Sequence, residues 1–376
     1  MQGLESLSQA QVAGFRLRRH HLVCRAPLKS LVEVVSDVVG VQAQLMSAAQ
    51  LALWARVDGI TQGDVTEVLW RKRGLVKTWC MRGAAHLLAA GDLLICVGGL
   101  LRKGLSRERE WLAKRGVSQS EAEAIVGAVV EALDDEVLVR KELAQRVVAV
   151  VGGKARRWVE HSWGGIVKLA CLQGLVCFGP NKGNEITFVR CDKWLPQLKE
   201  MPVEEAEEAL LRRYLHGYGP AGLRDFAAWS GMSVGEAVPV LERLVSEVVE
   251  VEVEGKRVLA LREDLEELRN AVLDDGEQCV RLLPSFDCFM LGHKDKSHLV
   301  DKAYYKRVYR KAGWLSPVVL VNGHVLGIWS HKQRGKRLHI TIEPFTKVSR
   351  IIHKGIHKEA SDLAQLFDTT CEVTFV

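Results

Sequence analysis

Hydrophobic residues in the first three quarters of the chain recur mostly at spacings of three and four, and short runs rich in Val, Leu and Phe separate these stretches. The first pattern is typical of amphipathic helices and the second of strands. In residues 8–73 it predicts four helices, followed by a hairpin with strands at 75–81 and 85–88. Helices followed by a two-stranded hairpin are the outline of a winged helix.

The same outline recurs twice further along the chain. A helix predicted at 159–173 precedes two strands near 175–189, and three helices precede strands at 248–252 and 257–261. Units that follow one another at intervals of roughly 80 residues indicate a structural repeat. We therefore expect three tandem winged-helix units, at residues 1–90, 91–200 and 201–278.

From residue 279 onward the pattern is mostly that of strands, with one helix expected near 346–366. Asn322-Gly323, between two strand-like runs, is a strong signal for a two-residue hairpin turn. We expect residues 279–376 to form a small, partly closed C-terminal β-barrel. The predicted fold class is therefore α+β and mostly α, with three winged-helix units followed by this barrel.

The composition is that of an ordinary globular protein, with 48% hydrophobic and 26% charged residues. No apolar run approaches the roughly 18 residues of a membrane span, and the N-terminus lacks the basic start and apolar core of a signal peptide. Nine cysteines without a CxxC pair indicate reduced thiols, so we expect a cytoplasmic protein. Cys171, Cys177 and Cys191 with His161 match no common zinc spacing, and we expect neither a metal nor a cofactor.

Charge is distributed unevenly along the chain, whose net charge is +6. Residues 1–200 carry +8, residues 201–278 carry −10 and residues 279–376 carry +8. Two basic segments around an acidic middle indicate a polyanion that is held by both ends of the molecule. The alternative is an ordinary variation in surface charge that serves no ligand.

The segment after the second predicted helix carries two glutamines, Gln42 and Gln44, that flank Ala43. In an extended backbone their side chains share one face, whereas on a helix they would diverge by about 200°. They therefore converge on one target only if the segment is not helical, and the alternative is a polar helix edge. The nearby carboxylates of Glu33 and Asp37 are expected to be solvated helix residues.

Five stretches of the chain, in the same order, resemble the AlkZ-like winged-helix DNA glycosylases, which unhook DNA crosslinks. They are Gln42-Ala43-Gln44 and residues 77–86, 213–220, 282–292 and 313–321. The resemblance spans nearly the whole chain and implies tandem winged helices and a β-barrel in a C-shaped body that wraps DNA. It implies that Gln42 and Gln44 are catalytic and places the chain in the Gln–apolar–Gln branch. Two departures affect the expected pocket surface: Ala84-Ala85 stands where Thr-Leu is expected, and Cys288 where Pro is expected.

Glutamine is not a strong base, because its amide does not titrate in the useful range. A guanine alkylated at position 7 is cationic and leaves as a neutral base, so two amide carbonyls that orient water and stabilise a positive sugar would suffice. We therefore predict a monofunctional DNA glycosylase for 7-alkylguanine-type lesions, including bulky adducts and interstrand crosslinks. It would act in DNA repair or in self-resistance to a DNA-alkylating natural product. The alternative is a non-catalytic winged-helix DNA-binding protein, either a regulator or a shield for damaged DNA.

Basic residues between two late strands predict a hairpin tip that reaches into a DNA groove, and the alternative is a solvated hairpin turn. Lys306 and Arg310, with Lys302, recur every fourth residue and predict one basic helix face. Arg82 and His86 lie beside the first hairpin, where a buried structural role is the alternative to a DNA contact. The expected partner is double-stranded DNA with alkyl or crosslink lesions, bound by a monomer. The hairpin residues are His331, Lys332, Arg334, Lys336 and Arg337.

Overall fold

The computed structural model describes residues 4–162, 165–273 and 278–376. Two residues of the predicted helix 159–173, and the end of the predicted third unit before residue 278, lie outside the described residues. The described chain forms three three-stranded sheets and one five-stranded sheet, each associated with helices. The architecture is therefore mixed α and β, with more residues in helices than in strands, which agrees with the predicted α+β class.

The first sheet contains the predicted hairpin and, in addition, the glutamine segment. Strand β2 pairs antiparallel with β4, so that Gln42 lies opposite His86, and the strand order is β2-β4-β3. The helices precede the hairpin as the sequence predicts, and a short π-helical turn, Glu67–Arg71, extends the fourth of them. The elements are α2 Leu31–Asp37, β2 Val41–Gln42, α3 Met46–Trp54, α4 Gln62–Thr66, β3 Leu75–Trp79 and β4 Ala85–Ala89.

The second sheet, of order β5-β7-β6, packs against α8 and α10. Helix α7 begins at the predicted capping box, in which Ser118 and Glu121 bond each other's backbone. The elements are α5 Leu93–Gly98, α6 Leu101–Ala113, α7 Gln119–Ala132, β5 Leu138–Val139, α8 Arg140–Val151, α9 Arg156–Val159, α10 Ile166–Leu172, β6 Val176–Lys182, β7 Glu185–Arg190 and α11 Cys191–Trp194.

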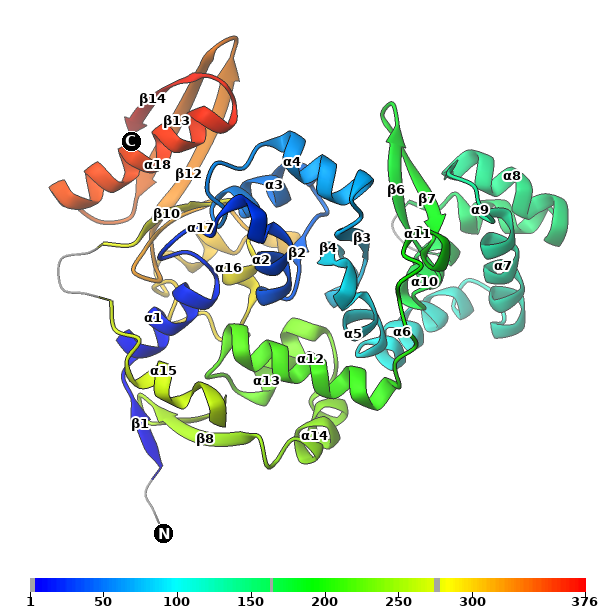
Figure 1. Cartoon of the computed structure of the whole chain (residues 1–376), viewed down its shortest axis with the longest axis horizontal. Helices are drawn as coiled ribbons and strands as arrows, with labels where there is room; N and C mark the ends of the chain where they lie inside the picture. Colours follow the sequence, from blue (N-terminus) through cyan, green and yellow to red (C-terminus); the bar gives the residue numbers. More distant parts are fainter. Residues whose placement is uncertain (1–3, 163–164, 274–277) are drawn as a thin grey trace.

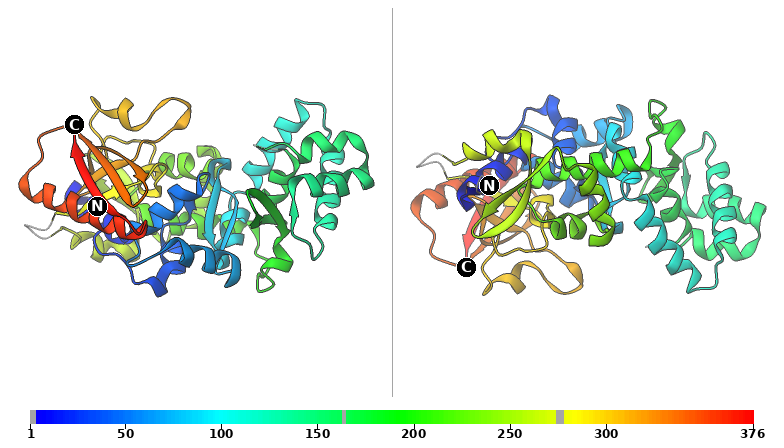
Figure 2. Two further views of the ribbon diagram at one scale, coloured as in Figure 1. Left: turned by 90° about the horizontal axis from the view of Figure 1, so that it is seen from above. Right: turned by 90° about the horizontal axis from the view of Figure 1, so that it is seen from below.

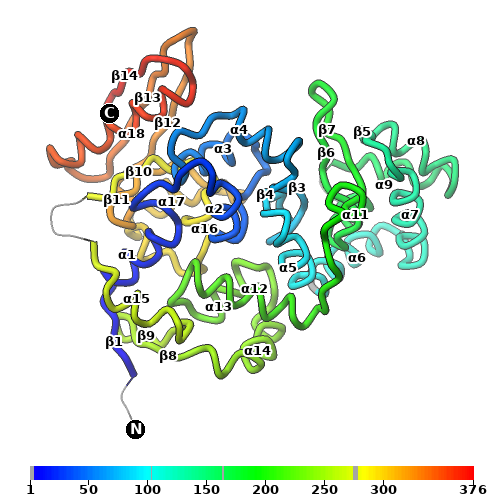
Figure 3. The backbone as a smooth tube through the Cα atoms, viewed as in Figure 1, coloured from blue at the N-terminus to red at the C-terminus, as the bar shows by residue number. Residues whose placement is uncertain are grey.

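The third sheet, of order β1-β8-β9, includes a strand from the beginning of the chain. Strand β1 pairs parallel with β8, and α1 packs beside α12 and α15 (Figure 3). Residues 5–19 thus lie with the third group of elements, a departure from the predicted boundary that placed them in a first unit at 1–90. The elements are β1 Glu5–Leu7, α1 Gln9–Arg19, α12 Val203–Tyr218, α13 Leu223–Ser230, α14 Val234–Arg243, β8 Val248–Val253, β9 Lys256–Leu261 and α15 Leu265–Arg269.

The C-terminal sheet is open, so the expected partly closed β-barrel is not confirmed. Its order is β10-β11-β12-β13-β14, and within the described residues the edge strands β10 and β14 do not pair with each other. Helix α18 packs against both edge strands. The helix thus occupies the position where the two edges of a barrel would meet. The elements are β10 Val280–Leu283, α16 Cys288–Leu291, α17 Tyr305–Val308, β11 Val318–Val321, β12 His324–Arg334, β13 Arg337–Pro344, α18 Arg350–Leu366 and β14 Thr370–Phe375.

The first group of elements occupies the middle of the molecule. Its α3 and α4 lie between two hairpins, β12–β13 and β6–β7, whose tips rise on the same side (Figures 1 and 2). One hydrophobic core is shared by α2, α3 and the C-terminal sheet. Across this core the fully buried Arg56 and Asp287 form a bidentate ion pair at 2.8 Å. No helix of the described residues combines the length and the apolar character needed to cross a bilayer.

Candidate functional site

The glutamine segment is set up by a sharp change of backbone direction at the end of α2. Val39 and Gly40 have φ values of 52° and 92°, in the left-handed region that a β-branched residue rarely adopts. A Cβ on Gly40 would lie 2.5 Å from Cδ2 of Leu88 and 3.1 Å from the carbonyl oxygen of Leu87. Glycine is therefore required at position 40, where the sequence shows an interruption of the helical pattern, so that β2 can lie flat against β4.

The segment is extended, which is the conformation that the two glutamine side chains need in order to share one face. The ladder of β2 continues for one residue beyond the strand, because the Ala43 N–H donates to the carbonyl of Ala85 over 2.7 Å. Exposure alternates along it: Val41 and Ala43 are fully buried, Gln42 is partly exposed and Gln44 is exposed. The two amides thus lie on the outward face of the first sheet.

Among the described residues, each glutamine side chain accepts one long hydrogen bond. Oε1 of Gln44 accepts from the backbone N–H of Ala85 over 3.4 Å, and Oε1 of Gln42 accepts from Nη2 of Arg82 over 3.3 Å. A carbonyl oxygen has two lone pairs, so each amide can still accept a hydrogen bond from a water molecule. The arrangement orients both carbonyls without saturating them.

Arg82 connects the glutamines to the third group of elements. It lies at the turn of the β3–β4 hairpin with a φ of 55°, and its Nη1 donates to the carbonyl of Trp229 at the end of α13. The backbone of α13 approaches so closely that a Cβ on Gly231 would lie 3.3 Å from Cα of Arg82. Burial lowers the pKa of Arg82. With its guanidinium engaged inside the protein, Arg82 fits the structural alternative better than the predicted DNA contact.

His86 is also placed for a structural role. Its side chain is 2% exposed, and Nδ1 lies 3.0 Å from the carbonyl of Ala84, to which it must donate because a carbonyl can only accept. Burial, together with the nearby charge of Arg82, lowers the pKa of His86 to about 3. A buried neutral imidazole offers no charge to a phosphate, so we remove His86 from the predicted DNA contacts.

The two carboxylates of α2, Glu33 and Asp37, are exposed to solvent and are not part of the glutamine site. Asp37 bonds Nε2 of His21 at 2.8 Å. The expectation that both are solvated helix residues is confirmed. Ser36, next to Asp37 in α2, accepts from Arg213 of α12 over 2.6 Å, and Arg213 also pairs with Asp92 at 2.7 Å, so Arg213 links α12 to α2 and to the turn after β4.

The basic hairpin predicted from the sequence is present, with Arg334 and Arg337 paired at its end. Lys332, Arg334, Lys336 and Arg337 are exposed, and within the described residues none of them forms a salt bridge. His331 differs from them: it is half-buried, its ring stacks on Trp329 at a centroid distance of 5.4 Å, and burial lowers its pKa. Four cations of the hairpin are thus free for an anionic partner.

The predicted basic helix face is not formed. Helix α17 has only four residues, Tyr305–Val308, because Tyr309 turns to an extended conformation and pairs with Leu315. Lys302 therefore lies in a turn before the helix and Arg310 lies after it. Lys306 and Arg310 are both exposed, but they are not aligned along one helix.

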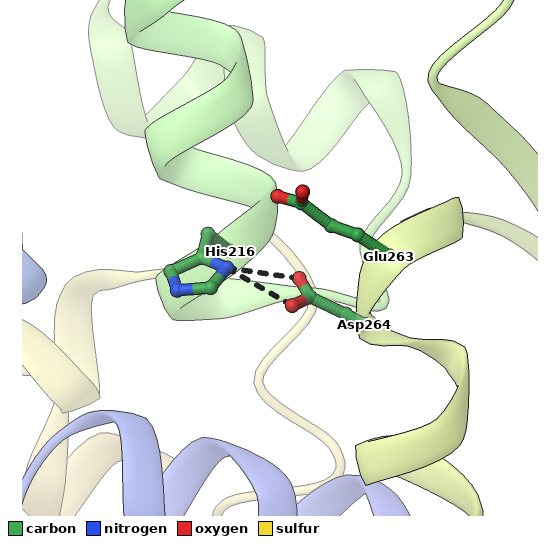
Figure 4. A group of neighbouring side chains, drawn as sticks. All are labelled: His216, Glu263 and Asp264. Carbon is green, nitrogen blue, oxygen red and sulfur yellow. Dashed lines mark hydrogen bonds and ion pairs between the residues drawn. The ribbon is translucent and has the colours of Figure 1, made fainter.

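One group of potential metal ligands occurs in the described residues, formed by His216, Glu263 and Asp264 (Figure 4). Arg19 donates to Nε2 of His216 over 2.7 Å and to Asp264 over 2.8 Å, while Nδ1 of His216 bonds Asp264 at 3.0 Å. The guanidinium already supplies the positive charge that the carboxylate needs, so this group fits an ion-pair network and not a metal site. The cysteine and histidine set considered from the sequence does not form such a group.

Comparisons with known proteins agree on one family. The family model described as "DNA glycosylase AlkZ-like" matches residues 35–366. A protein of Streptomyces sahachiroi named "Interstrand DNA cross-link repair glycosylase" is 32% identical over 368 residues, which is 95% of this chain and 96% of that protein. The solved structure of the Streptomyces sahachiroi DNA glycosylase AlkZ is similar with a TM-score of 0.87 at 30% identity, over 99% of this chain and 100% of that one.

Proposed function

The chain belongs to the AlkZ-like family of DNA glycosylases, and we propose that it hydrolyses the N-glycosidic bond of cationic 7-alkylguanine-type lesions, including bulky adducts and interstrand crosslinks. The observation that carries this proposal is the pair of outward-facing amides, Gln42 and Gln44, each held by one hydrogen bond. The activity would serve the repair of alkylated DNA or self-resistance to a DNA-alkylating natural product.

The chemistry follows from what an amide can supply. A 7-alkylguanine carries a positive charge on its imidazole ring, so breakage of the C1′–N9 bond releases a neutral base without prior protonation. Positive charge then moves to the sugar, where the carbonyl dipoles of Gln42 and Gln44 stabilise it and orient a water molecule for attack at C1′. Water adds to C1′ and loses its proton to solvent. Undamaged guanine is not cationic, so the same site would leave it intact.

Arg82 acts as a positioning residue in this proposal. Its hydrogen bond to Gln42 fixes the amide plane, and its second bond, to the carbonyl of Trp229, fixes the guanidinium. An oriented dipole needs no reorganisation when charge develops on the sugar, which is the property that makes fixed amides effective. The backbone N–H of Ala85 does the same for Gln44.

We propose that the three helix-and-hairpin groups are tandem winged helices that contact duplex DNA, in a C-shaped body that wraps it. Two hairpins rise on the same side as α3 and α4 (Figure 1), and the tip of β12–β13 carries four exposed cations without carboxylate partners among the described residues. Such cations bind phosphates and give affinity that depends on salt. Lys306 and Arg310 would add to this surface. The proposed partner is damaged double-stranded DNA, bound by a monomer that uses no metal or other cofactor.

The substrate assignment is tested with three duplexes: one with a single 7-methylguanine, one crosslinked by a nitrogen mustard, and one unmodified. Released bases leave abasic sites, which alkali converts to strand breaks, and an enzyme-free sample of each duplex corrects for the breaks that the treatment itself makes at 7-alkylguanine. The proposal predicts breaks at both kinds of lesion and none in the unmodified duplex. Tight binding without breaks at either lesion would overturn it and favour a non-catalytic DNA-binding role.

A further inference from the structure

A cavity of about 200 Å³ lies between α3 and the C-terminal sheet, and the glycosylase chemistry described above does not use it. Its walls come from the first turns of α3, the chain before β11 and after β10, strand β12 and the end of α18. In Figure 1 these elements lie side by side at the base of the β12–β13 hairpin. The lining includes Leu45, Ser47, Ala48, Trp329, His331 and Phe367.

One wall of the cavity is a row of three rings. Trp329 and His331 stack with centroids 5.4 Å apart, and His331 and Phe367 lie 5.5 Å apart. Nε1 of Trp329 donates to the carbonyl of Leu283 over 2.8 Å, so the first ring is fixed. Burial lowers the pKa of His331, which favours its neutral form and suits it to apolar contact. The three rings give this wall of the cavity an aromatic lining, with which a planar apolar group can make favourable contacts.

The cavity adjoins the glutamine segment directly. Leu45 follows Gln44 in the chain, lines the cavity, and is 42% exposed although it is apolar. Consecutive Cα atoms are about 3.8 Å apart, so the backbone of Gln44 lies next to a residue of the cavity wall. An exposed leucine beside polar catalytic residues, at the mouth of a ring-lined cavity, is the pattern of a ligand pocket in which a few polar groups accompany an apolar lining.

We propose that this cavity binds a planar apolar group carried by the alkylated guanine, so that it recognises the alkyl part of the lesion and not the base. The role rests on the proposed function, because it is the position of Gln44 that brings a lesion to the cavity. The volume fits one aromatic ring, since a protein cavity of roughly 150 Å³ is enough to hold benzene. Lesions with an aryl group are therefore bound more tightly than lesions with a methyl group.

The test compares the affinities of wild-type protein for two duplexes, one with 7-benzylguanine and one with 7-methylguanine. A 2′-fluoro sugar at the lesion destabilises the sugar cation, so both lesions stay intact during the measurement. Wild type should prefer the benzyl duplex by at least about tenfold, as expected for burial of a phenyl ring. Ser47→Phe fills the mouth of the cavity from an exposed position of α3 and should abolish this preference.

Ser120→Phe is the matched control, because Ser120 is exposed and occupies the same second position of its helix, α7. It should retain the preference for the benzyl duplex. No preference in wild type, or a preference that survives Ser47→Phe, would overturn the assignment. Equal weakening of both lesions by Ser47→Phe would also overturn it, because the cavity would then hold the base itself.

The two proposals fail separately in these measurements. Release of 7-methylguanine without any preference for the benzyl duplex would refute the proposed role of the cavity but not the proposed glycosylase activity. A preference that Ser47→Phe removes, in a protein that releases neither base, would refute the substrate assignment and leave the cavity standing.

Discussion

Nη2 of Arg82 donates to Oε1 of Gln42 across 3.3 Å, and the other terminal nitrogen of the same guanidinium donates to the carbonyl of Trp229. The bond to Gln42 joins two segments of the first sheet. The bond to Trp229 reaches α13, 147 residues later in the sequence. The orientation of Gln42 thus depends on how the first and third groups of elements pack together.

Replacing Arg82 by Lys should slow catalysis more than it weakens DNA binding. A lysine amine cannot reach both partners with the planar fork of a guanidinium, so the amide of Gln42 would lose its fixed orientation. We expect kcat to fall about tenfold to a hundredfold with little change in KM. Arg71→Lys, on an exposed arginine, is the control. A lower affinity with a reduced salt dependence, at unchanged kcat, would instead mean that Arg82 binds a phosphate.

Removing charge from the tip of the β12–β13 hairpin should weaken DNA binding at low salt. Each phosphate contact contributes about 0.9 to the slope of log affinity against log salt concentration, so Arg334→Ala/Lys336→Ala should reduce the slope by about 1.8. Arg257→Ala/Arg262→Ala removes the same charge from exposed residues of the acidic third segment and should leave the slope nearly unchanged. Equal effects of the two pairs would show that only net charge matters.

Gly40→Ala should destabilise the protein by about 3 kcal/mol, because it adds a clash to the strain of a left-handed backbone. The new Cβ would meet Leu88 at 2.5 Å. Gly59→Ala is a matched control: Gly59 also has a positive φ, of 63°, but nothing lies within 4 Å of its Cβ position, so only the strain of about 1 kcal/mol remains. Urea unfolding measures both, and equal losses would mean that β2 can shift to accept the methyl group.

His86 should make the protein less stable in acid. Its pKa is about 3 when folded, against 6.5 ordinarily, so between these values the unfolded chain binds a proton that the folded chain does not. The free energy of unfolding therefore falls as the pH drops below about 6.5, by up to roughly 1.4 kcal/mol per pH unit for this group. His86→Gln should remove this contribution between pH 6.5 and 5, whereas His357→Gln, on an exposed residue, should not. Equal pH slopes for wild type and His86→Gln would contradict the buried neutral state.

The local features of the fold could be predicted from the sequence because they depend on neighbouring residues. The capping box at Ser118 begins α7, and Asn322-Gly323, with φ values of 49° and 85°, turns the chain between β11 and β12. The sequence left two alternatives open for the glutamine segment, an extended strand or a polar helix edge, and Gly40, which interrupts the helical pattern, favours the extended state that the structure has.

Features that depend on distant packing could not be predicted. The parallel pairing of Glu5–Leu7 with Val251–Val253 joins segments about 245 residues apart, and no local pattern indicates it. Closure of the C-terminal sheet depends on where α18 packs. Arg82 is enclosed by its contact with α13, and His86 is buried by the register of β4. Neither contact can be read from neighbouring residues, and for this reason the sequence predicted that both side chains would be available to DNA.

The measurement that tests the central claim most directly is the single-turnover rate of base release from a duplex with one 7-methylguanine, for wild type and for Gln42→Ala/Gln44→Ala. Thermal stability and duplex affinity of both proteins are measured alongside. If the amide pair stabilises the sugar cation, the rate should fall at least about a hundredfold while stability and affinity stay unchanged. An unchanged rate in a folded, DNA-binding double variant would contradict the assignment and place the chemistry elsewhere in the protein.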